Sequence, residues 1–321
     1  MTKDMIHQIL DEVNKEFGDN TAIILDEDNI LKVDVVSTGI PVIDEAVGIG
    51  GFPRGRISEV FGAEACGKTT LCLHAIAQTQ REGKLAAFID AEHALSPDRM
   101  KEIGVDLGQL IINQPNSGEE ALELVEMLVR SNKFSIIVVD SVAALIPQVE
   151  VDKDMGESVM GVHARLMSQA MRKLTAPVDH HNVALVFTNQ TRAKIGGYVP
   201  GTTTTGGAAL KFYASLRLEM KYVGAIKNTA GERVSGKYKM TVVKNKLAVP
   251  FKVAEFEING YGIDATSGLI EQLVEAGVLE NSGAFYRFEG ETLAQGKQAL
   301  ISILRTNPTI YENLVTRLKV R

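Results

Sequence analysis

Long apolar runs alternate with helical patterns through the middle of this chain of 321 residues. Residues 85–90, 135–140 and 182–188 are almost continuously apolar, which is typical of strands buried on both faces of a sheet. Residues 56–61 predict a further strand, and residues 70–78 predict a helix soon after it. Strands that alternate with helices indicate an α/β fold with a largely parallel sheet flanked by helices, whose ligands lie at the carboxyl ends of the strands.

The start of the chain departs from this alternation. Apolar residues at helical spacing predict one amphipathic N-terminal helix, whose stripe consists of Ile6, Ile9, Leu10, Val13 and Phe17. Such a helix needs a surface to pack on, which belongs either to the same chain or to a neighbouring subunit. We assign residues 1–32 to this helix and its linker, and residues 33–263 to the α/β core.

Residues 264–321 predict a small α+β C-terminal domain. They contain a helical pattern at 269–277, a strand at 284–288 and two helices on either side of Asn307–Pro308. The last 31 residues carry five basic and two acidic side chains. This excess suits a polyanion, but a solvated surface has the same composition, and the sequence leaves both interpretations open.

Composition excludes some classes of protein and leaves others open. The hydrophobic share of 45% supplies a sizeable core, and two cysteines exclude a disulfide scaffold. No apolar run approaches the ~20 residues of a membrane helix, so we expect no membrane partner and a cytoplasmic location. The net charge of −6 comes from the first 30 residues, which hold eight acids and two bases, so total charge does not decide the partners.

The segment between the strand at 56–61 and the helix after it carries the first chemistry. It matches G-x-x-x-x-G-K-[ST], the phosphate loop (P-loop, Walker A) of nucleoside triphosphatases. Glycines let backbone N–H groups approach a triphosphate, Lys68 would neutralise its β and γ phosphates, and Thr69 would ligate Mg²⁺. The predicted ATP-binding residues are Gly62, Ala63, Glu64, Ala65, Cys66, Gly67, Lys68, Thr69 and Thr70.

Polar side chains at the ends of three predicted strands complete a candidate site. Asp140 ends an apolar strand in the manner of a Walker B carboxylate, which holds the shell of Mg²⁺. Asp90, Glu92 and His93 follow another strand, and spacing alone does not decide which of them activates the attacking water. Gln190 follows a third strand, where an amide can sense a γ phosphate by hydrogen bonding.

Two segments predict loops with the composition of nucleic-acid contacts. Residues 194–207 are too rich in glycine and threonine for regular structure, so we expect a mobile loop attached to the candidate sensor. A second flexible stretch, at 152–161, precedes a helix on which Arg165 and Arg172 are seven residues apart and share a face. Two cations on one face suit phosphates, although an ion-paired surface explains them equally well.

Together these residues closely resemble the bacterial RecA recombinases over nearly the whole chain. Beyond the phosphate loop, the resemblance rests on the blocks at 87–95, 138–145, 167–174, 203–215 and 242–246. It implies a RecA-type P-loop core that polymerises on single-stranded DNA and pairs it with homologous double-stranded DNA. ATP would be hydrolysed with Mg²⁺ at the interfaces of a helical homo-filament. In this family such proteins act in DNA repair and the SOS response to DNA damage, where a repressor whose self-cleavage the filament promotes is a further partner that the sequence leaves open.

The resemblance also implies roles for individual residues. It matches Glu92 to the catalytic glutamate and Gln190 to the γ-phosphate switch. Lys244 and Lys246 match lysines that reach the ATP of the adjacent subunit, and Phe212 matches an aromatic residue that couples subunits. The implied DNA-binding residues are Met160, Arg165, Arg172, Arg192, Lys194, Gly206 and Gly207. The N-terminal helix matches a segment that docks on a neighbour, which favours oligomerisation for that helix.

Three departures from the family pattern stand out. Ser96 and Arg99 replace the usual acid and tyrosine beside the adenine, so the expected ring stacking is absent. The guanidinium of Arg99 is able to stack on adenine instead, and the sequence leaves the nucleotide preference open. The loop at 196–207 is one residue shorter than usual and carries threonines at 202–205. The chain ends at Arg321 without an acidic tail, from which we expect easier loading on duplex DNA, to be tested by grafting such a tail and timing the lag in duplex binding.

Two other functions remain as alternatives. A hexameric helicase motor shares the fold but would carry an arginine finger and an accessory domain. A regulator that binds ATP only as a structural ligand would show no turnover stimulated by single-stranded DNA. The intact set of Lys68, Thr69, Asp140 and Glu92 argues against the second alternative.

Overall fold

The computed structural model describes residues 2–18, 22, 33–154, 161–193, 202–227, 231–264 and 266–319. Internal contacts divide the chain into two units, Met1–Val33 and Asp34–Arg321. The first unit contains α1 (Thr2–Phe17), as the apolar spacing predicts. Ile6, Ile9 and Phe17 on its stripe are all exposed. Most of the predicted linker lies outside the described residues.

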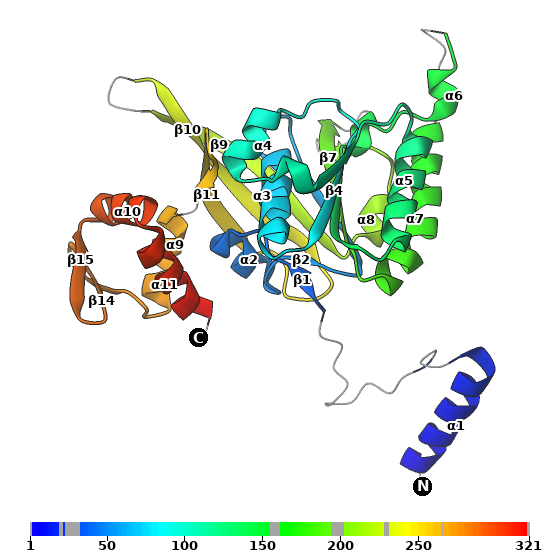
Figure 1. Cartoon of the computed structure of the whole chain (residues 1–321), viewed down its shortest axis with the longest axis horizontal. Helices are drawn as coiled ribbons and strands as arrows, with labels where there is room; N and C mark the ends of the chain where they lie inside the picture. Colours follow the sequence, from blue (N-terminus) through cyan, green and yellow to red (C-terminus); the bar gives the residue numbers. More distant parts are fainter. Residues whose placement is uncertain are drawn as a thin grey trace. The chain divides into compact units, whose positions relative to one another are not determined.

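The second unit is built on one large sheet (Figure 1). Its described residues form ten strands, in the order β12-β11-β10-β9-β3-β7-β6-β4-β5 with β8 paired to β7. The strands are β3 (Arg56–Gly62), β4 (Leu85–Asp90), β5 (Leu110–Asn113), β6 (Phe134–Asp140), β7 (Ala184–Ala193), β8 (Thr202–Thr204), β9 (Leu216–Lys227), β10 (Arg233–Asn245), β11 (Val253–Asn259) and β12 (Gly262–Asp264). Pairing is parallel from β5 to β9 and antiparallel from β9 to β12.

Helices cover both faces of this sheet (Figure 1). Those in the core are α2 (Pro41–Val47), α3 (Lys68–Arg81), α4 (Pro97–Ile103), α5 (Gly118–Arg130), α6 (Gln148–Val151), α7 (Val162–His180) and α8 (Ala209–Tyr213). Alternate residues of β6 face opposite sides, because side chains alternate along a strand. Ile136 and Val138 join the cluster that contains α3, whereas Ile137 and Val139 join the cluster that contains α5 and α7. Burial on both faces explains why the predicted strands are continuously apolar.

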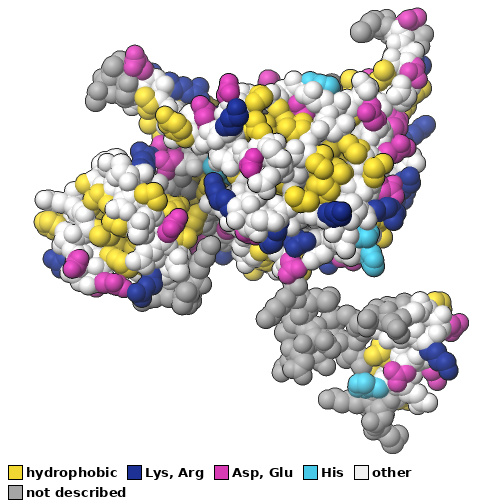
Figure 2. Space-filling view, in the orientation of Figure 1, with side chains coloured by type: hydrophobic (Ala, Val, Ile, Leu, Met, Phe, Trp, Pro, Cys, Tyr) yellow, Lys and Arg dark blue, Asp and Glu magenta, His cyan; other side chains and the backbone are white. Residues whose placement is uncertain are grey.

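Smaller elements complete the core. The pair β1 (Val35–Val36) and β2 (Phe52–Pro53) forms a separate two-stranded sheet, and short 3₁₀ turns occupy Leu107–Gln109 and Val142–Ala144. None of the helices among the described residues is long and apolar enough to cross a membrane. Figure 2 shows that hydrophobic side chains reach the surface of the core unit in clusters. Ile111 and Ile112 on β5, the last strand at one edge of the sheet, are 46% and 43% exposed.

One prediction about the glycine- and threonine-rich segment is wrong. Thr202–Thr204 form β8, which pairs antiparallel with Thr191, Arg192 and Ala193 at the end of β7. The β-branched threonines favour a pleated strand, and the extension of β7 gives them a partner. Gln190 therefore lies inside β7, which continues to Ala193, and not in a turn that follows the strand.

The C-terminal segment has the α+β composition expected from its sequence. It contains α9 (Thr266–Glu275), α10 (Lys297–Thr306), α11 (Pro308–Lys319) and the antiparallel sheet β13 (Glu280–Ser282), β14 (Phe285–Phe288) and β15 (Glu291–Gln295). Leu269, Leu300 and Leu314 are buried in its centre. Pro308 begins α11, since the fixed φ of proline suits the first position of a helix.

Three cations of this segment are paired with acids. Lys297 Nζ lies 2.6 Å from Glu271, and Arg317 Nη2 lies 2.6 Å from Glu289. Arg305 Nε contacts Asp264 at 2.6 Å, and its Nη2 lies 3.7 Å from Glu257. The positive excess counted in the sequence is thus partly compensated by acids from outside the last 31 residues.

Candidate functional site

The phosphate loop joins β3 to α3 in a conformation that requires its glycines. A Cβ on Gly62 would lie 2.2 Å from the carbonyl oxygen of Met220, which is impossible without moving the backbone of β9. Gly67 has φ +89°, in the left-handed region, and its Cβ would lie 2.4 Å from Ile258. Because α3 begins at Lys68, its first N–H groups face the loop and form a site for anions.

Lys68 is a buried cation held by carbonyl groups. Its Nζ donates to the carbonyl oxygen of Ala63 at 2.7 Å, and the residue is 8% exposed. Within the described residues, no carboxylate lies at ion-pair distance from it. Burial raises the pKa of the neighbouring Cys66 thiol, against the pull of the Lys68 ammonium. An ammonium buried without an acid is poised to accept an anionic ligand.

Asp140 lies at the end of β6 between two hydroxyl groups. Thr69 Oγ1 donates to its Oδ2 at 2.5 Å, and Thr188 Oγ1 donates to its Oδ1. Burial raises the pKa of this carboxyl above its ordinary value, although both hydrogen bonds act in the opposite direction. The two predicted metal ligands, Thr69 and Asp140, are therefore in direct contact, and their oxygen atoms are of the type that Mg²⁺ binds.

The structure distinguishes Asp90, the last residue of β4, from Glu92, which follows the strand. Asp90 is buried and accepts hydrogen bonds from the amide groups of Ala94 and Gln114. Glu92 is exposed, and its Oε1 accepts from Ser141 Oγ at 2.5 Å and from Gln190 Nε2 at 3.0 Å. Asp90 thus stabilises the loop, whereas Glu92 is in contact with the predicted sensor.

These groups surround one cavity of about 320 Å³. Its lining contains most of the predicted site: Glu64, Ala65, Cys66, Gly67, Lys68, Thr69, Thr70, Glu92, Asp140 and Gln190. Arg99, Tyr238 and Ile258 complete the lining. No sequence motif marks Tyr238 and Ile258. Each is one of several alternating buried residues in β10 or β11, and antiparallel pairing brings these strands to the cavity.

A buried polar network lies next to Gln190, the predicted γ-phosphate sensor. Asn189, fully buried, donates to Glu59 Oε1 at 2.9 Å and to the carbonyl oxygen of Thr205 at 3.1 Å. Arg217 Nε contacts Glu59 Oε2 at 2.5 Å, and its guanidinium lies 4.4 Å from the ring of Phe61. Sequence reasoning missed this network, although polar residues inside apolar strands, such as Glu59, are a usable signal. The network therefore joins Asn189 of β7 to Thr205, the residue that follows β8.

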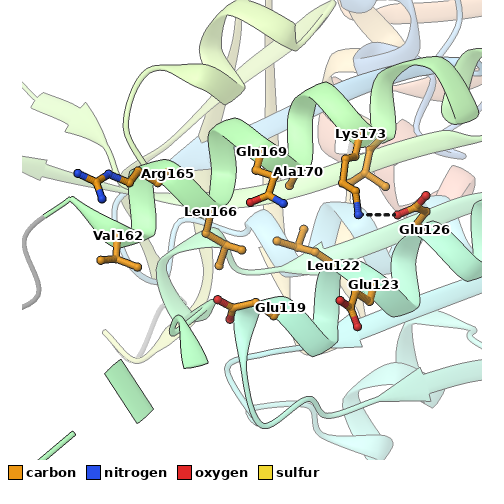
Figure 3. A pocket seen from close by; sticks show the side chains of 11 residues that line it. Glu119, Leu122, Glu123, Glu126, Val162, Arg165, Leu166, Gln169, Ala170 and Lys173 are labelled. Atoms are coloured by element: carbon orange, nitrogen blue, oxygen red, sulfur yellow. Dashed lines mark ion pairs between the residues drawn. The ribbon is translucent and has the colours of Figure 1, made fainter. Parts of the chain in front are cut away.

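The predicted DNA-binding residues fall into two groups. Arg165 and Arg172 are exposed on α7, as the spacing predicts, but they line different hollows. Arg165 lies at one end of a groove between α5 and α7 (Figure 3). Lys173 and Glu126, which form an ion pair, line the same groove farther along α7. Arg192 Nη2 donates to Gln190 Oε1 at 3.2 Å.

The second group packs against the start of α7. A Cβ on Gly206 would lie 2.7 Å from Val142, and one on Gly207 would lie 2.9 Å from the Cβ of Ala164. The end of the second predicted loop therefore contacts the helix that follows the first one. Met160 and Lys194 lie outside the described residues.

Lys244, Lys246 and Phe212 lie apart from the phosphate-loop cavity. Lys244 Nζ donates to the carbonyl oxygens of Lys211 and Phe212, at the end of α8. Its pKa is lowered, mainly by burial and then by the neighbouring charges of Lys246 and Arg217. Phe212 is 74% exposed and shares the lining of a different cavity with Lys246. In a single subunit, the described lining of the phosphate-loop cavity includes none of the three.

Family models identify the chain. The RecA N-terminal domain matches residues 4–264, and the RecA C-terminal domain matches residues 267–321. The chain belongs to the RecA family. Protein RecA of Amycolatopsis mediterranei is 47% identical over 312 residues, 97% of this chain and 89% of that protein. Protein RecA of Desulforapulum autotrophicum is 48% identical over 317 residues, 98% of this chain and 91% of that protein.

Membership of the RecA family confirms the predicted class of activity. The chain is an ATP-dependent recombinase of homologous recombination and a DNA-dependent ATPase. Its partners are single-stranded DNA, double-stranded DNA and further copies of itself in a filament. The helicase and the non-catalytic regulator are thereby excluded.

Proposed function

We propose that this RecA-family chain hydrolyses ATP in the cavity between Lys68 and Glu92, and that DNA controls hydrolysis through Gln190. The observation that carries the proposal is the pair of hydrogen bonds to Glu92 Oε1, from Ser141 and from Gln190. Glu92 acts as the general base for water, and Gln190 holds it until a γ phosphate competes for the amide. Because Gln190 lies directly before the residues that pair with β8, movement of that strand pair reaches the base.

Two further groups complete the chemistry of the phosphates. Lys68 neutralises the β and γ phosphates, and the N–H groups from Gly62 to Thr70 bind their oxygen atoms. Thr69 and Asp140 hold Mg²⁺, which when bound neutralises the charge that develops on the phosphates. Their mutual contact and their oxygen donors support this assignment.

A neighbouring copy supplies the remaining charge. Lys244 and Lys246 are displayed on another surface of the subunit beside the exposed Phe212, so they serve the ATP of an adjacent subunit. Hydrolysis then depends on correct stacking of subunits, because a site completed by a neighbour's cations is inactive alone. Among the described residues, the edge of β5 that has no strand partner and the exposed stripe of α1 are two apolar surfaces available for this stacking.

DNA lies against the exposed face of α7 and the end of the second loop. Arg165, Arg172 and Arg192 bind phosphates, and the N–H groups of Gly206 and Gly207 assist them. From the family resemblance we also assign Met160 and Lys194 to DNA binding, with Met160 as an apolar wedge between bases. These contacts carry no sequence information, as recombination between arbitrary homologous sequences requires.

The wider assignments follow from this picture. Residues 1–32 serve oligomerisation, residues 33–263 form the ATPase core with DNA loops near 152–161 and 191–207, and residues 264–321 form the C-terminal α+β domain. We place the filament in the cytoplasm, where bacterial DNA is found, and propose that it promotes self-cleavage of a repressor in the SOS response.

Glu92→Gln tests the role of the base directly. We expect turnover stimulated by single-stranded DNA to fall by about 10²–10⁴-fold, because the amide cannot accept a proton but preserves size. His93→Gln is the matched control, since His93 is the exposed neighbour that spacing alone did not exclude. Electron microscopy of the same samples should show filaments for both variants. Equal turnover in Glu92→Gln and wild type would contradict the assignment.

A further inference from the structure

The large sheet of the core divides at its carboxyl edge, between β6 and β7. In the described part of the chain, backbone pairing between these two strands ends at Val139 and Phe187. Beyond that point β6 stays paired with β4, through Asp140 and Asp90, whereas β7 stays paired with β3 as far as Gln190. The predicted metal ligand Asp140 and the sensor Gln190 therefore belong to different halves of this edge.

Two side-chain hydrogen bonds from β7 cross the division. Gln190 Nε2 donates to Glu92 Oε1 at 3.0 Å, and Thr188 Oγ1 donates to Asp140 Oδ1. Glu92 belongs to the same half as β6, because its backbone N–H donates to the carbonyl oxygen of Asp140 at 3.2 Å. Thr188 and Gln190 are two residues apart, so their side chains lie on the same side of β7. One strand thus contacts both the base and a metal ligand of the proposed site.

Packing does not explain the hydroxyl group of Thr188. The residue is fully buried, and Val186 and Phe187, which precede it in β7, are fully buried and apolar. Valine has almost the same shape without a polar atom, and a buried hydroxyl is unfavourable unless it is hydrogen-bonded. The partner of this hydroxyl is the carboxylate of Asp140. We therefore assign the hydroxyl to Asp140 and not to the core.

Asp140 is held at both of its oxygen atoms. Thr69 Oγ1 donates to Oδ2 at 2.5 Å, and Thr188 donates to Oδ1. Thr69 is itself a predicted metal ligand, whereas Thr188 lies outside the described lining of the cavity. A group that binds a metal ligand without touching the metal fixes the orientation of that ligand. Loss of such a group commonly lowers metal affinity about 10–100-fold.

We propose that Thr188 is a positioning residue for Asp140, and that it makes the Mg²⁺ site respond to DNA through β7. The inference rests on the function proposed above. From Thr188, β7 continues through Gln190 into the strand pair with β8, which contains the predicted DNA-binding residue Arg192. A movement of this pair that releases Gln190 from Glu92 also shifts Thr188 against Asp140, because both bonds come from one continuous strand. The metal ligand and the base are then adjusted together.

Binding of Mn²⁺ to the full-length protein tests the positioning role. Mn²⁺ takes the same oxygen ligands as Mg²⁺, and electron paramagnetic resonance measures the concentration of the free ion. In complex with a non-hydrolysable ATP analogue, Thr188→Val should weaken Mn²⁺ binding about tenfold or more, because Asp140 loses one of its two anchors. Thr188→Ser keeps the hydroxyl, and its affinity should remain within about threefold of the wild type.

Thr79→Val is the matched control. Thr79 is also buried, but it lies in α3, and its hydroxyl donates to the carbonyl oxygen of Ala75 at 2.8 Å. This variant should bind Mn²⁺ as the wild type does, and the melting temperature of each variant shows whether it folds.

Single-stranded DNA tests the link through β7. Its addition should change the Mn²⁺ dissociation constant of the wild type by at least about fivefold, in the range of an ordinary coupling between two sites. The same addition should change that of Thr188→Val by less than about twofold, since the contact between β7 and Asp140 is lost.

Each result decides one part of the inference. A folded Thr188→Val variant with wild-type Mn²⁺ affinity overturns the positioning role, as does a Thr188→Ser variant as weak as Thr188→Val. A DNA effect that is absent in the wild type, or undiminished in Thr188→Val, overturns the link through β7. Asp140→Asn tests the proposed metal site itself. If this variant binds Mn²⁺ as the wild type does, the assignment of Asp140 is wrong, whereas weak binding by Asp140→Asn and normal binding by Thr188→Val overturn this inference alone.

Discussion

Lys68 in the nucleotide cavity and three cations of the C-terminal segment have opposite surroundings in the structure. Lys68 is buried, and no described carboxylate lies at ion-pair distance from it. Lys297, Arg305 and Arg317 are partly exposed, and each is paired with an acid of the same chain. A basic residue is therefore available to an anionic ligand only where no acid of the same chain is paired with it.

The difference follows from the energy of charge burial. A buried ammonium without an acid is unfavourable in the free protein, and a bound anion removes that penalty. An exposed ion pair stabilises by only about 0–1 kcal/mol and leaves little net charge for a ligand. A count of basic residues in the sequence cannot separate these cases, whereas the pairing in the structure does.

Removal of the unpaired cation should have the largest effect. We expect Lys68→Ala to reduce ATP hydrolysis stimulated by DNA by about 10³-fold, because the charge of the β and γ phosphates is no longer compensated. Lys84→Ala is the control, since Lys84 pairs with Glu82 at the surface. Steady-state hydrolysis with saturating single-stranded DNA measures both. Retention of more than a tenth of wild-type turnover in Lys68→Ala would remove the basis of the comparison.

Asp140 offers a test with the opposite charge. Burial raises its pKa, so between the ordinary and the raised pKa the folded protein binds more protons than the unfolded one. Stability therefore falls as pH rises through this window. Asn at this position stays neutral and preserves an acceptor for one hydroxyl, so without Mg²⁺ and nucleotide Asp140→Asn should raise the melting temperature at neutral pH.

The rise should be about 2–4 °C for each kcal/mol of burial cost removed, and should vanish below pH ~3, where the wild-type carboxyl is largely neutral in both states. Scanning calorimetry from pH ~3 to pH ~8 measures it, with the exposed Asp154→Asn as control. A variant that melts lower than the wild type at every pH would show that Asp140 is already compensated by Thr69 and Thr188 in the free protein.

The paired cations should give the smallest effect. Replacing Lys297, Arg305 and Arg317 together by alanine should weaken duplex binding by less than about threefold and leave its salt dependence unchanged, since each charge is already compensated. Replacing Arg165 and Arg172 should lower the salt slope by about 2. Fluorescence anisotropy at several salt concentrations distinguishes the two variants. A loss of duplex affinity larger than about threefold in the C-terminal variant, with a lower salt slope, would show that these basic residues contact DNA.

Much of the phosphate end of the site could be predicted from the sequence. The loop from Gly62 to Thr69 is contiguous, and its chemistry depends on local backbone shape. The strands before Asp90 and Asp140 are buried on both faces, so their apolar runs are plain, and parallel pairing brings their ends together. Spacing alone did not separate Glu92 from Asp90 and His93, and the family resemblance singled out Glu92. Its contacts with Ser141 and Gln190, which lie 49 and 98 residues away, could not be read from the local sequence.

Long-range pairing explains what could not be predicted. The antiparallel half of the sheet brings Tyr238 and Ile258 to the cavity, and no local pattern marks them. The partner of β8 is an extension of β7 that lies beyond the apolar run, so composition alone suggested an irregular loop. Pairing of Arg305 with Asp264 likewise depends on packing between elements, which the sequence of α10 does not contain.

The joint between α3 and β12 depends on an uncharged histidine. His74 Nε2 accepts the backbone N–H of Ile263 at 2.8 Å, and Gly262 leaves room for the ring. Burial, with the charges of Arg81 and Arg99, lowers the pKa of His74 to about 4. At pH ~6, one unit below neutrality, this ring is still neutral, and Nε2 still accepts the hydrogen bond from Ile263. The attachment of the last core strand should consequently withstand acid stress that protonates ordinary histidines.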